Sequence, residues 1–210
     1  MKSLIRCLLI FGTLSTCSIG CFAQNGVDGA NGPVVEQTGK GGVATLYALD
    51  PLAQSFCFRD GGAGHVFQQN EVRNRCSDIN YHSYYAEQFA VGIEGARVGA
   101  IVDLGTTEDL KKEYGYEETV GAGQGFASVH FENGKLVILK DRHSREMQDL
   151  KESEQIFAQP SPTAKAAVKV GHIYLARITD RRDANAQVLV KLLVISHVPG
   201  ESVTFRWQSL

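Results

Sequence analysis

The sequence lacks the short motifs that mark the common catalytic and metal sites. It contains no C-x-x-C or H-E-x-x-H spacing, and no serine stands in a G-x-S-x-G elbow. A glycine-rich stretch at 121–125 is spaced like a phosphate cradle, but no Walker lysine follows it. The sequence therefore predicts no metal and no cofactor, and no motif identifies a catalytic residue.

An excess of basic charge is also missing. The chain has 21 Lys and Arg residues against 23 Asp and Glu residues, which gives a formal net charge of -2 at pH 7. Proteins that bind nucleic acid gain most of their affinity by neutralising phosphates with a basic surface. We therefore predict no nucleic-acid partner.

Long hydrophobic runs are absent, and the short run at 7–14 is typical of a secretory signal. Lys2 and Arg6 precede this run, small residues follow it, and it is too short to span a bilayer. Cys21 and Ala23 are small residues at the two positions that a signal peptidase inspects. We predict a signal peptide at 1–23 and a secreted or periplasmic protein without a transmembrane segment after cleavage.

Two cysteines of this leader leave an alternative fate open. The segments that end at Cys17 and Cys21 resemble the lipobox of bacterial lipoproteins, in which the cysteine is lipidated and becomes the new N-terminus. Thr16 and Ser18 depart from the usual residues of that motif. A lipid-anchored envelope protein is therefore the alternative to free secretion.

Cysteine is scarce in the remainder of the chain, where only Cys57 and Cys76 occur. An even pair in an oxidising compartment predicts a disulfide. Closing a loop of about twenty residues would stabilise the fold by roughly 3 kcal/mol in the chain-entropy model. The alternative is two free thiols or part of a metal site.

The period of the apolar residues indicates a β-rich fold. Residues 24–42 are rich in glycine and predict a flexible lead-in, and 43–210 predict a single domain with the two-residue period of strands. The expected strands are 43–49, 54–59, 88–94, 97–104, 125–131, 135–140, 172–178, 187–195 and 202–207.

Turn residues and two charged stretches complete the predicted fold. Asn133 and Gly134 predict a type I′ hairpin, and a second hairpin is expected between 88–94 and 97–104. Short helices are expected at 107–115 and, unless it is an ordered loop, at 142–157. Together these features predict an antiparallel β-sandwich or a partly closed barrel with one or two short helices.

The first candidate binding segment is the long polar loop at 59–88. It brings four aromatic or imidazole side chains close together in the sequence: Tyr81, His82, Tyr84 and Tyr85. Exposed rings on such a loop can stack on sugars or fill a pocket of a partner. The alternative is that the tyrosines enter the core as an irregular strand.

The second candidate is the charged connection between the strands expected at 172–178 and 187–195. Arg181 and Arg182 lie between two aspartates there and would suit a clamp for a carboxylate or a sulfate. The simpler interpretation is a solvated turn in which these charges neutralise one another.

Histidines and carboxylates offer a third possibility, but only if the fold gathers them. Six histidines are isolated in the sequence: His65, His82, His130, His143, His172 and His197. Seven carboxylates are candidates for acid and base chemistry: Asp60, Glu71, Asp78, Glu87, Glu94, Asp103 and Glu132.

No family signature accompanies these features, so the functional expectation remains broad. We expect an exported, non-enzymatic β-rich module of the bacterial cell envelope that binds a protein or glycan partner through the 59–88 loop. One alternative is a secreted hydrolase whose site is assembled from dispersed carboxylates and histidines. The other is a purely structural envelope component.

Overall fold

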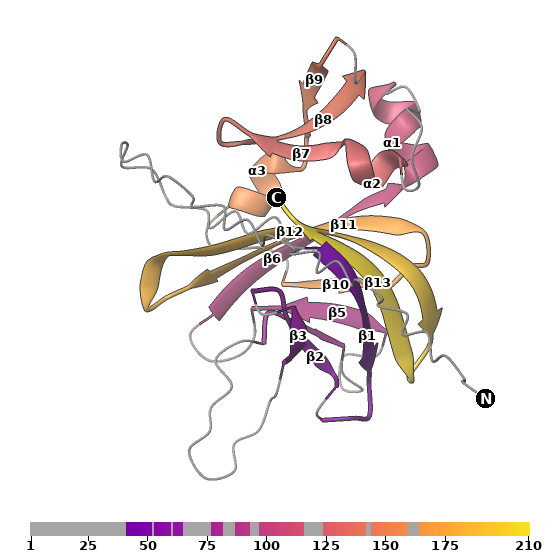
Figure 1. Ribbon diagram of the computed structural model, residues 1–210, viewed down its shortest axis with the longest axis vertical. Coiled ribbons are helices and arrows are strands. Elements are labelled where there is room, and N and C mark those ends of the chain that lie inside the picture. The colour runs from indigo at the N-terminus through magenta and orange to yellow at the C-terminus, as the bar shows by residue number, and fades with distance from the viewer. Residues whose placement is uncertain are drawn as a thin grey trace, which may run out of the picture. The chain divides into compact units, whose positions relative to one another are not determined.

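Antiparallel strands form most of the fold in a computed structural model of the chain (Figure 1). The structure describes residues 41–51, 53–59, 61–64, 77–81, 87–92, 97–115, 124–141, 144–158 and 164–210. The strands are β1 (Gly41–Tyr47), β2 (Ser55–Cys57), β3 (Gly62–Gly64), β4 (Ile79–Tyr81), β5 (Gln88–Val91), β6 (Arg97–Thr106), β7 (Val129–Glu132), β8 (Lys135–Asp141), β9 (Glu146–Asp149), β10 (Lys165–Ala167), β11 (His172–Asp180), β12 (Asp183–Val198) and β13 (Ser202–Ser209). The helices are α1 (Thr107–Tyr114), α2 (Gln124–Ser128) and α3 (Ser153–Phe157).

The strands form three sheets. Sheet A has the order β1-β13-β12-β11-β6, sheet B the order β10-β5-β4-β2-β3, and sheet C the order β7-β8-β9. Neighbouring strands are antiparallel, and no sheet closes on itself within the described part of the chain. The mainly β prediction is therefore confirmed, as an open sandwich of packed sheets with short helices rather than a barrel.

Sheet A is the central layer because its middle strands are apolar on both faces. On β11, Tyr174, Ala176 and Ile178 belong to the core that sheet A shares with sheet B. The alternate residues Ile173 and Leu175 belong to a second core, shared with sheet C and the helices. Side chains of a strand alternate between faces, so both faces must be covered. Figure 1 shows sheet B on one side and sheet C with the helices on the other.

The core between sheets A and B is rich in aromatic rings. The ring of Phe56 contacts those of Phe58, Phe205 and Trp207 at centroid separations of 5.4, 6.1 and 5.5 Å, all edge to face. Such pairs are favourable beyond the area that they bury. This core therefore holds β2 of sheet B against β13 of sheet A.

Helix α1 follows the capping pattern in its sequence. The Thr106 side chain accepts a hydrogen bond from the Asp109 N–H at 3.2 Å, and the Asp109 carboxylate accepts one from the Thr106 N–H at 2.8 Å. This reciprocal capping box satisfies donors that the first turn would leave unpaired. Gly115 ends the helix in the left-handed conformation. The helix expected at 107–115 is confirmed.

Of the two predicted hairpins, only one forms. Asn133 and Gly134 adopt φ of 52° and 80° between β7 and β8, as a type I′ turn requires. The expected pairing of 88–94 with 97–104 is wrong, because β5 belongs to sheet B and β6 to sheet A. A Cβ on Gly92 would lie only 2.2 Å from the Gly99 nitrogen. The two strands therefore cross in close contact instead of pairing.

Two further local predictions need correction. The segment expected as a strand at 125–131 begins as helix α2 and becomes β7 only at Val129. The segment at 142–157 contains strand β9 followed by helix α3 rather than a single helix or loop. In both cases the second core takes up the apolar side chains, including Phe126 and Ile156. Tertiary packing therefore overrides the local pattern there.

Candidate functional site

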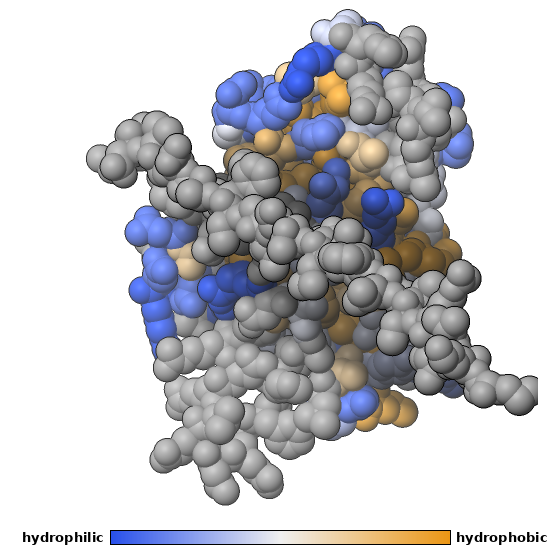
Figure 2. Space-filling view, viewed as in Figure 1, coloured by the Kyte–Doolittle hydropathy of each residue, from blue (hydrophilic) through white to orange (hydrophobic). Residues whose placement is uncertain are grey.

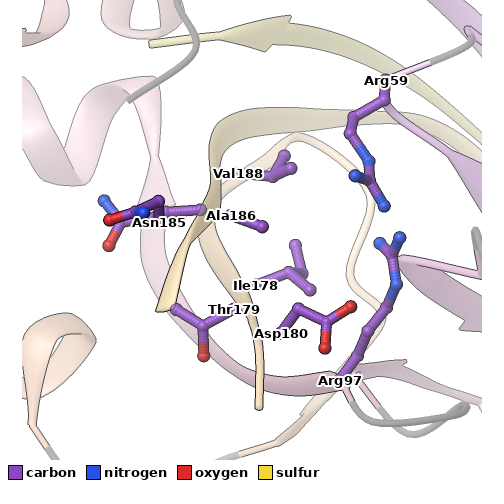
Figure 3. A pocket seen from close by; sticks show the side chains of 9 residues that line it. Arg59, Arg97, Ile178, Thr179, Asp180, Asn185, Ala186 and Val188 are labelled. Atoms are coloured by element: carbon purple, nitrogen blue, oxygen red, sulfur yellow. The ribbon is translucent and has the colours of Figure 1, made fainter. Parts of the chain in front are cut away.

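A pocket with charged and apolar residues in its lining lies at one end of sheet A, where β11 turns into β12 (Figure 3). It contains about 340 Å³ of empty space, part of which is open to solvent. Nine residues line it: Arg59, Arg97, Ile178, Thr179, Asp180, Asn185, Ala186, Gln187 and Val188. The part that a water-sized molecule can enter is about 40 Å³, well below the roughly 300–1,000 Å³ of small-molecule sites, so the pocket has room for one small group of a partner.

Arg97 is the buried cation of the pocket. It begins β6 and is only 7% exposed. Its Nη1 group donates to Oδ1 of Asp78, a carboxylate with no solvent exposure. The other oxygen of Asp78 accepts a hydrogen bond from the Phe58 N–H at 2.9 Å. A buried charge is tolerated only when paired and hydrogen-bonded, and Asp78 meets both conditions.

Arg59 supplies the second guanidinium. It follows Phe58 directly, so the carboxylate that holds Arg97 also holds the backbone beside Arg59. Figure 3 shows the two guanidinium groups directed toward each other on one side of the pocket, with the Asp180 carboxylate on the hairpin side. Asp78 therefore holds the Arg97 side chain and the backbone that precedes Arg59.

A bulge in the β11–β12 hairpin builds the opposite wall. Thr179 pairs with Gln187 and Asp180 pairs with Asp183, which leaves three residues of β12 without partners on β11. The Asp180 carboxylate accepts a hydrogen bond from the Arg182 N–H at 2.9 Å. Bulges redirect side chains next to functional sites. This one brings Asn185 to the pocket.

The two arginines of the charged turn lie outside this pocket lining. Arg181 and Arg182 are exposed at the tip of the hairpin, on the turn between β11 and β12. Figure 2 shows a hydrophilic surface over this tip. The solvated turn is therefore confirmed, whereas the clamp formed by these two residues stays a prediction.

Tyr81 lies in the core rather than on the surface. It is 1% exposed, and its hydroxyl is 2.8 Å from Nε2 of His197 and accepts a hydrogen bond from the Gly200 N–H at 3.3 Å. Burial raises the pKa of Tyr81, and the Gly200 bond only partly offsets this. The alternative in which this tyrosine enters the core is the one that the structure supports.

Several predicted residues lie outside the described part of the chain. These are His82, Tyr84 and Tyr85 of the candidate loop and Cys76 of the expected disulfide. Cys57 is buried in β2. The Cys57–Cys76 bond and the exposed aromatic cluster therefore stay predictions.

The fold brings one histidine and one carboxylate together at another place. Asp103 on β6 and His172 on β11 are 69 residues apart in the sequence, yet Nδ1 of His172 lies 2.9 Å from Oδ1 of Asp103. The Gly105 N–H and Lys169 also donate to this carboxylate, at 2.8 and 3.1 Å. Burial acts to raise the pKa of Asp103, but these hydrogen bonds outweigh it and hold the pKa below its usual value.

Such a pair orients an imidazole as in acid and base catalysis. However, no described serine or cysteine is hydrogen-bonded to His172. Within the described residues, no group of three histidine, cysteine or acidic side chains is arranged to hold a metal ion. The pair is therefore an incomplete constellation, and it fits a general base better than a nucleophilic triad.

The remaining candidates are dispersed. His130 on β7 is half-buried, and its pKa is lowered by burial and by Lys191. Glu132 pairs with Arg145 at 3.2 Å on the surface. Asp60, Glu71, Glu94, His65 and His143 lie outside the described residues.

Sequence inspection missed the two arginines that line the pocket. The available signal was Arg97, a charged residue at the start of the otherwise apolar stretch 97–104. Arginine is almost never fully buried without a partner, so a buried arginine in such a strand predicts a carboxylate nearby. Nothing in the sequence identifies Asp78 as that partner.

Comparisons with known proteins provide no further guide. No family model matches this sequence, and neither a curated protein nor a solved structure matches it significantly. No helix in the described part of the chain is long and apolar enough to cross a membrane. We therefore infer function from the site alone.

Proposed function

We propose that this chain is an exported, non-enzymatic β-sandwich module of the bacterial cell envelope, which binds a protein or glycan partner at the pocket beside the β11–β12 hairpin. The observation that supports this proposal is the pair of guanidinium groups, Arg59 and Arg97, that face each other on one side of an open pocket. The leader and the predicted disulfide support export.

Burying Arg97 and Asp78 is difficult to explain by stability alone. Replacing a buried ion pair by apolar residues of similar volume is often neutral or stabilising. An apolar pair would therefore fill this position at least as well if packing were its only role. Retaining the charges keeps N–H donors fixed at the wall of a pocket, and such preorganisation favours binding.

The pocket contains one residue from each of the two candidate binding segments predicted from the sequence. Arg59 begins the candidate loop at 59–88, and Asp180 begins the charged turn. The two segments are about 120 positions apart in the sequence, and the fold places a residue of each in one pocket. Binding by segments on a rigid sheet scaffold is the usual arrangement in proteins.

Filling the pocket tests the proposal. The variant Ala186→Trp should abolish capture of crosslinked envelope components by the exported protein, because Ala186 lines the pocket. The matched control is Leu49→Trp, at an exposed position that does not line this pocket. Equal capture by both variants, with both folded by circular dichroism, would exclude this pocket as the binding site.

The Asp103–His172 pair supports a second candidate, a secreted hydrolase that uses His172 as a general base. The wild-type protein should then hydrolyse some member of a panel of chromogenic esters and glycosides. The variant His172→Gln should lose that activity without losing its fold. A wild-type protein that is inactive on the whole panel would count against this candidate and leave the binding proposal unaffected.

A further inference from the structure

We propose that strand β1 is an interaction surface, at which a second copy of this chain adds its own β1 in antiparallel orientation. The two A sheets would then join into one continuous sheet. The inference goes beyond the pocket, because none of the residues that line the pocket lies on β1.

Strand β1 is the edge strand of sheet A next to β13 (Figure 1). Its seven residues, GGVATLY, include no charged residue and no proline, and its register with β13 is regular from Gly41 to Tyr47. An edge strand presents a row of backbone N–H and C=O groups that can pair with another chain. Proteins usually block such a row with charges, prolines, bulges or very short strands. None of these devices is present on β1.

The other edge strands that the structure describes are blocked. Strands β3 and β10 of sheet B have three residues each, and β7 of sheet C has four. Strand β9 carries the acidic residues Glu146 and Asp149, each in a surface ion pair. Strand β6, at the opposite edge of sheet A, begins with the ion-paired Arg97 and has a bulge against β11. Among these described edges, β1 is therefore the one that is suited to pairing.

Hydrogen bonds at the end of β1 show which of its backbone groups point outward. The Ala48 N–H donates to the Glu201 carbonyl of the neighbouring hairpin at 2.7 Å, whereas the Tyr47 N–H donates to the Ala53 carbonyl on the other side at 3.0 Å. The direction of these groups alternates from residue to residue along an antiparallel strand. The odd-numbered residues of β1 therefore direct their N–H and C=O groups away from β13.

The accessible part of this edge extends from Gly41 to Thr45. Within the described part of the chain, no residue pairs with the outward groups of Gly41, Val43 and Thr45. Tyr47 differs, because its C=O accepts from the Asp50 N–H at 3.1 Å and its N–H is bonded to the same turn. A hollow that is partly open to solvent adjoins the start of the strand and is lined in part by Gly41 and Val43. The turn after Tyr47 therefore marks the end of the free edge.

A second copy fits this edge by symmetry. Two β1 strands related by a two-fold axis at Val43 would place Gly41 of one copy opposite Thr45 of the other, and Val43 opposite Val43. Each of these residues has outward N–H and C=O groups, so each pair would exchange two hydrogen bonds. Val43, which is 64% exposed, would also contact its counterpart on the same face of the sheet. Two-fold association is the commonest arrangement of identical chains.

Length and charge also favour a second copy over an unrelated strand. The same turn after Tyr47 limits both the free edge and the segment that the second copy adds to it, so the two match in length. Both strands are uncharged, so no like charges are opposed across the contact. The dimer would carry two open pockets, and two linked pockets bind a repetitive partner more tightly than one.

The test is sedimentation velocity of the exported protein at concentrations from about 1 µM to 1 mM, a range that covers a small and weak interface. The wild-type protein should change from the mass of one chain to the mass of two. Val43→Pro should stay at the mass of one chain, because it removes an outward N–H, and proline is tolerated on an edge strand whose N–H faces solvent. Val43→Thr keeps this N–H and is the matched control, which should still form the dimer.

A second variant keeps the test valid if the proline alters folding. Val43→Lys should weaken the dimer at least about ten-fold, because it places two like charges opposite each other. Its control is Ile195→Lys, at an exposed apolar position of β12, which should leave the dimer unchanged. Circular dichroism checks that all four variants are folded.

Amide hydrogen exchange identifies the strand that pairs. The Val43 and Thr45 amides should exchange more slowly as the concentration of the wild-type protein rises, and Val43→Lys should abolish this change at Thr45. Protection that does not depend on concentration would mean that the chain covers its own edge, and it would overturn the proposal. The mass of one chain at every concentration would also overturn it. A dimer that persists in both Val43→Pro and Val43→Lys would contradict it as well, because the interface would then lie elsewhere.

Discussion

The two faces of sheet A are covered in different ways. The face toward sheet B is packed with apolar and aromatic residues, among them Ala44, Phe205 and Trp207. The opposite face is covered along β6, β11 and β12, but it also buries Lys191, and on β1 it leaves Val43 and Tyr47 exposed by 64% and 51%. The charges buried toward sheet B, Arg97 and Asp78, form an ion pair, whereas Lys191 on the second face has no described ion-pair partner and part of that face is open.

Lys191 is the strongest departure from an apolar interior. It is 2% exposed, its Nζ donates to the Val129 carbonyl at 2.7 Å, and it lies 4.8 Å from the centroid of the Phe126 ring. Arg206 faces the same ring at 5.0 Å. No described carboxylate forms an ion pair with Lys191. Burial, with a further contribution from Arg206, lowers the pKa of Lys191 to about 7.

The largest effect should come from the aromatic core on the face toward sheet B. Trp207→Ala should lower the free energy of unfolding by about 3–5 kcal/mol, because it leaves a cavity among Phe56, Phe58 and the backbone. Urea denaturation followed by circular dichroism measures this loss. A loss below about 1 kcal/mol would mean that sheet B does not supply the main core.

An effect of opposite sign is expected on the other face. Lys191→Met should raise the free energy of unfolding by about 1–4 kcal/mol at pH 6, because it removes a buried cation without an ion-pair partner. The pKa of this lysine is about 7 in the fold and 10.5 in the unfolded chain. Between these values the unfolded state binds more protons, so the wild-type protein gains stability as pH rises.

The advantage of the methionine variant should therefore be largest below pH 7 and should shrink toward pH 10. Denaturation at pH 6, 8 and 10 measures the trend, and Lys112→Met, at an exposed position of α1, is the matched control. A lower stability of Lys191→Met at every pH would show that the bond to the Val129 carbonyl outweighs the cost of burial. In that case the two faces would be alike in energetic terms.

A smaller effect is expected at the edge of the second face. Thr106→Ala should lower the free energy of unfolding by about 1 kcal/mol, because the Asp109 N–H loses its acceptor in the capping box. Chemical denaturation of this variant and of the control Lys112→Ala measures the difference. Equal stability of the two variants would mean that packing of Leu110 and Tyr114 alone holds α1.

The sequence predicts the positions of the strands in sheet A well, but it predicts poorly which strands pair with one another. Alternation in 172–178 and the turn residues Asn133 and Gly134 act locally, so they can be read directly. The pairing partners of β5 and β6 cannot be read in this way. Their two-residue period fits two strands paired in one sheet as well as it fits two strands that belong to different sheets. The deciding contact, the close approach of Gly92 to Gly99, is a tertiary one.

The candidate site was still less predictable for the same reason. Asp78 and Arg97 are 19 residues apart and Asp103 and His172 are 69 apart, so no motif window contains either pair. The sequence predicted the two segments that contribute residues to the pocket. The residues within them could be chosen only after the strands were placed.

The smallest effect should occur on the open part of the second face. Tyr47 lies beside Ser202 of β13 and is 51% exposed, so Tyr47→Ser should change the free energy of unfolding by no more than about 0.5 kcal/mol. The same denaturation assay compares it with Trp207→Ala, whose side chain lies on the other face of sheet A. A loss similar to that of the tryptophan variant would mean that Tyr47 is covered in the native protein. A neutral result would establish that sheet A is stabilised chiefly from the side of sheet B, and that the open face is free to change without loss of the fold.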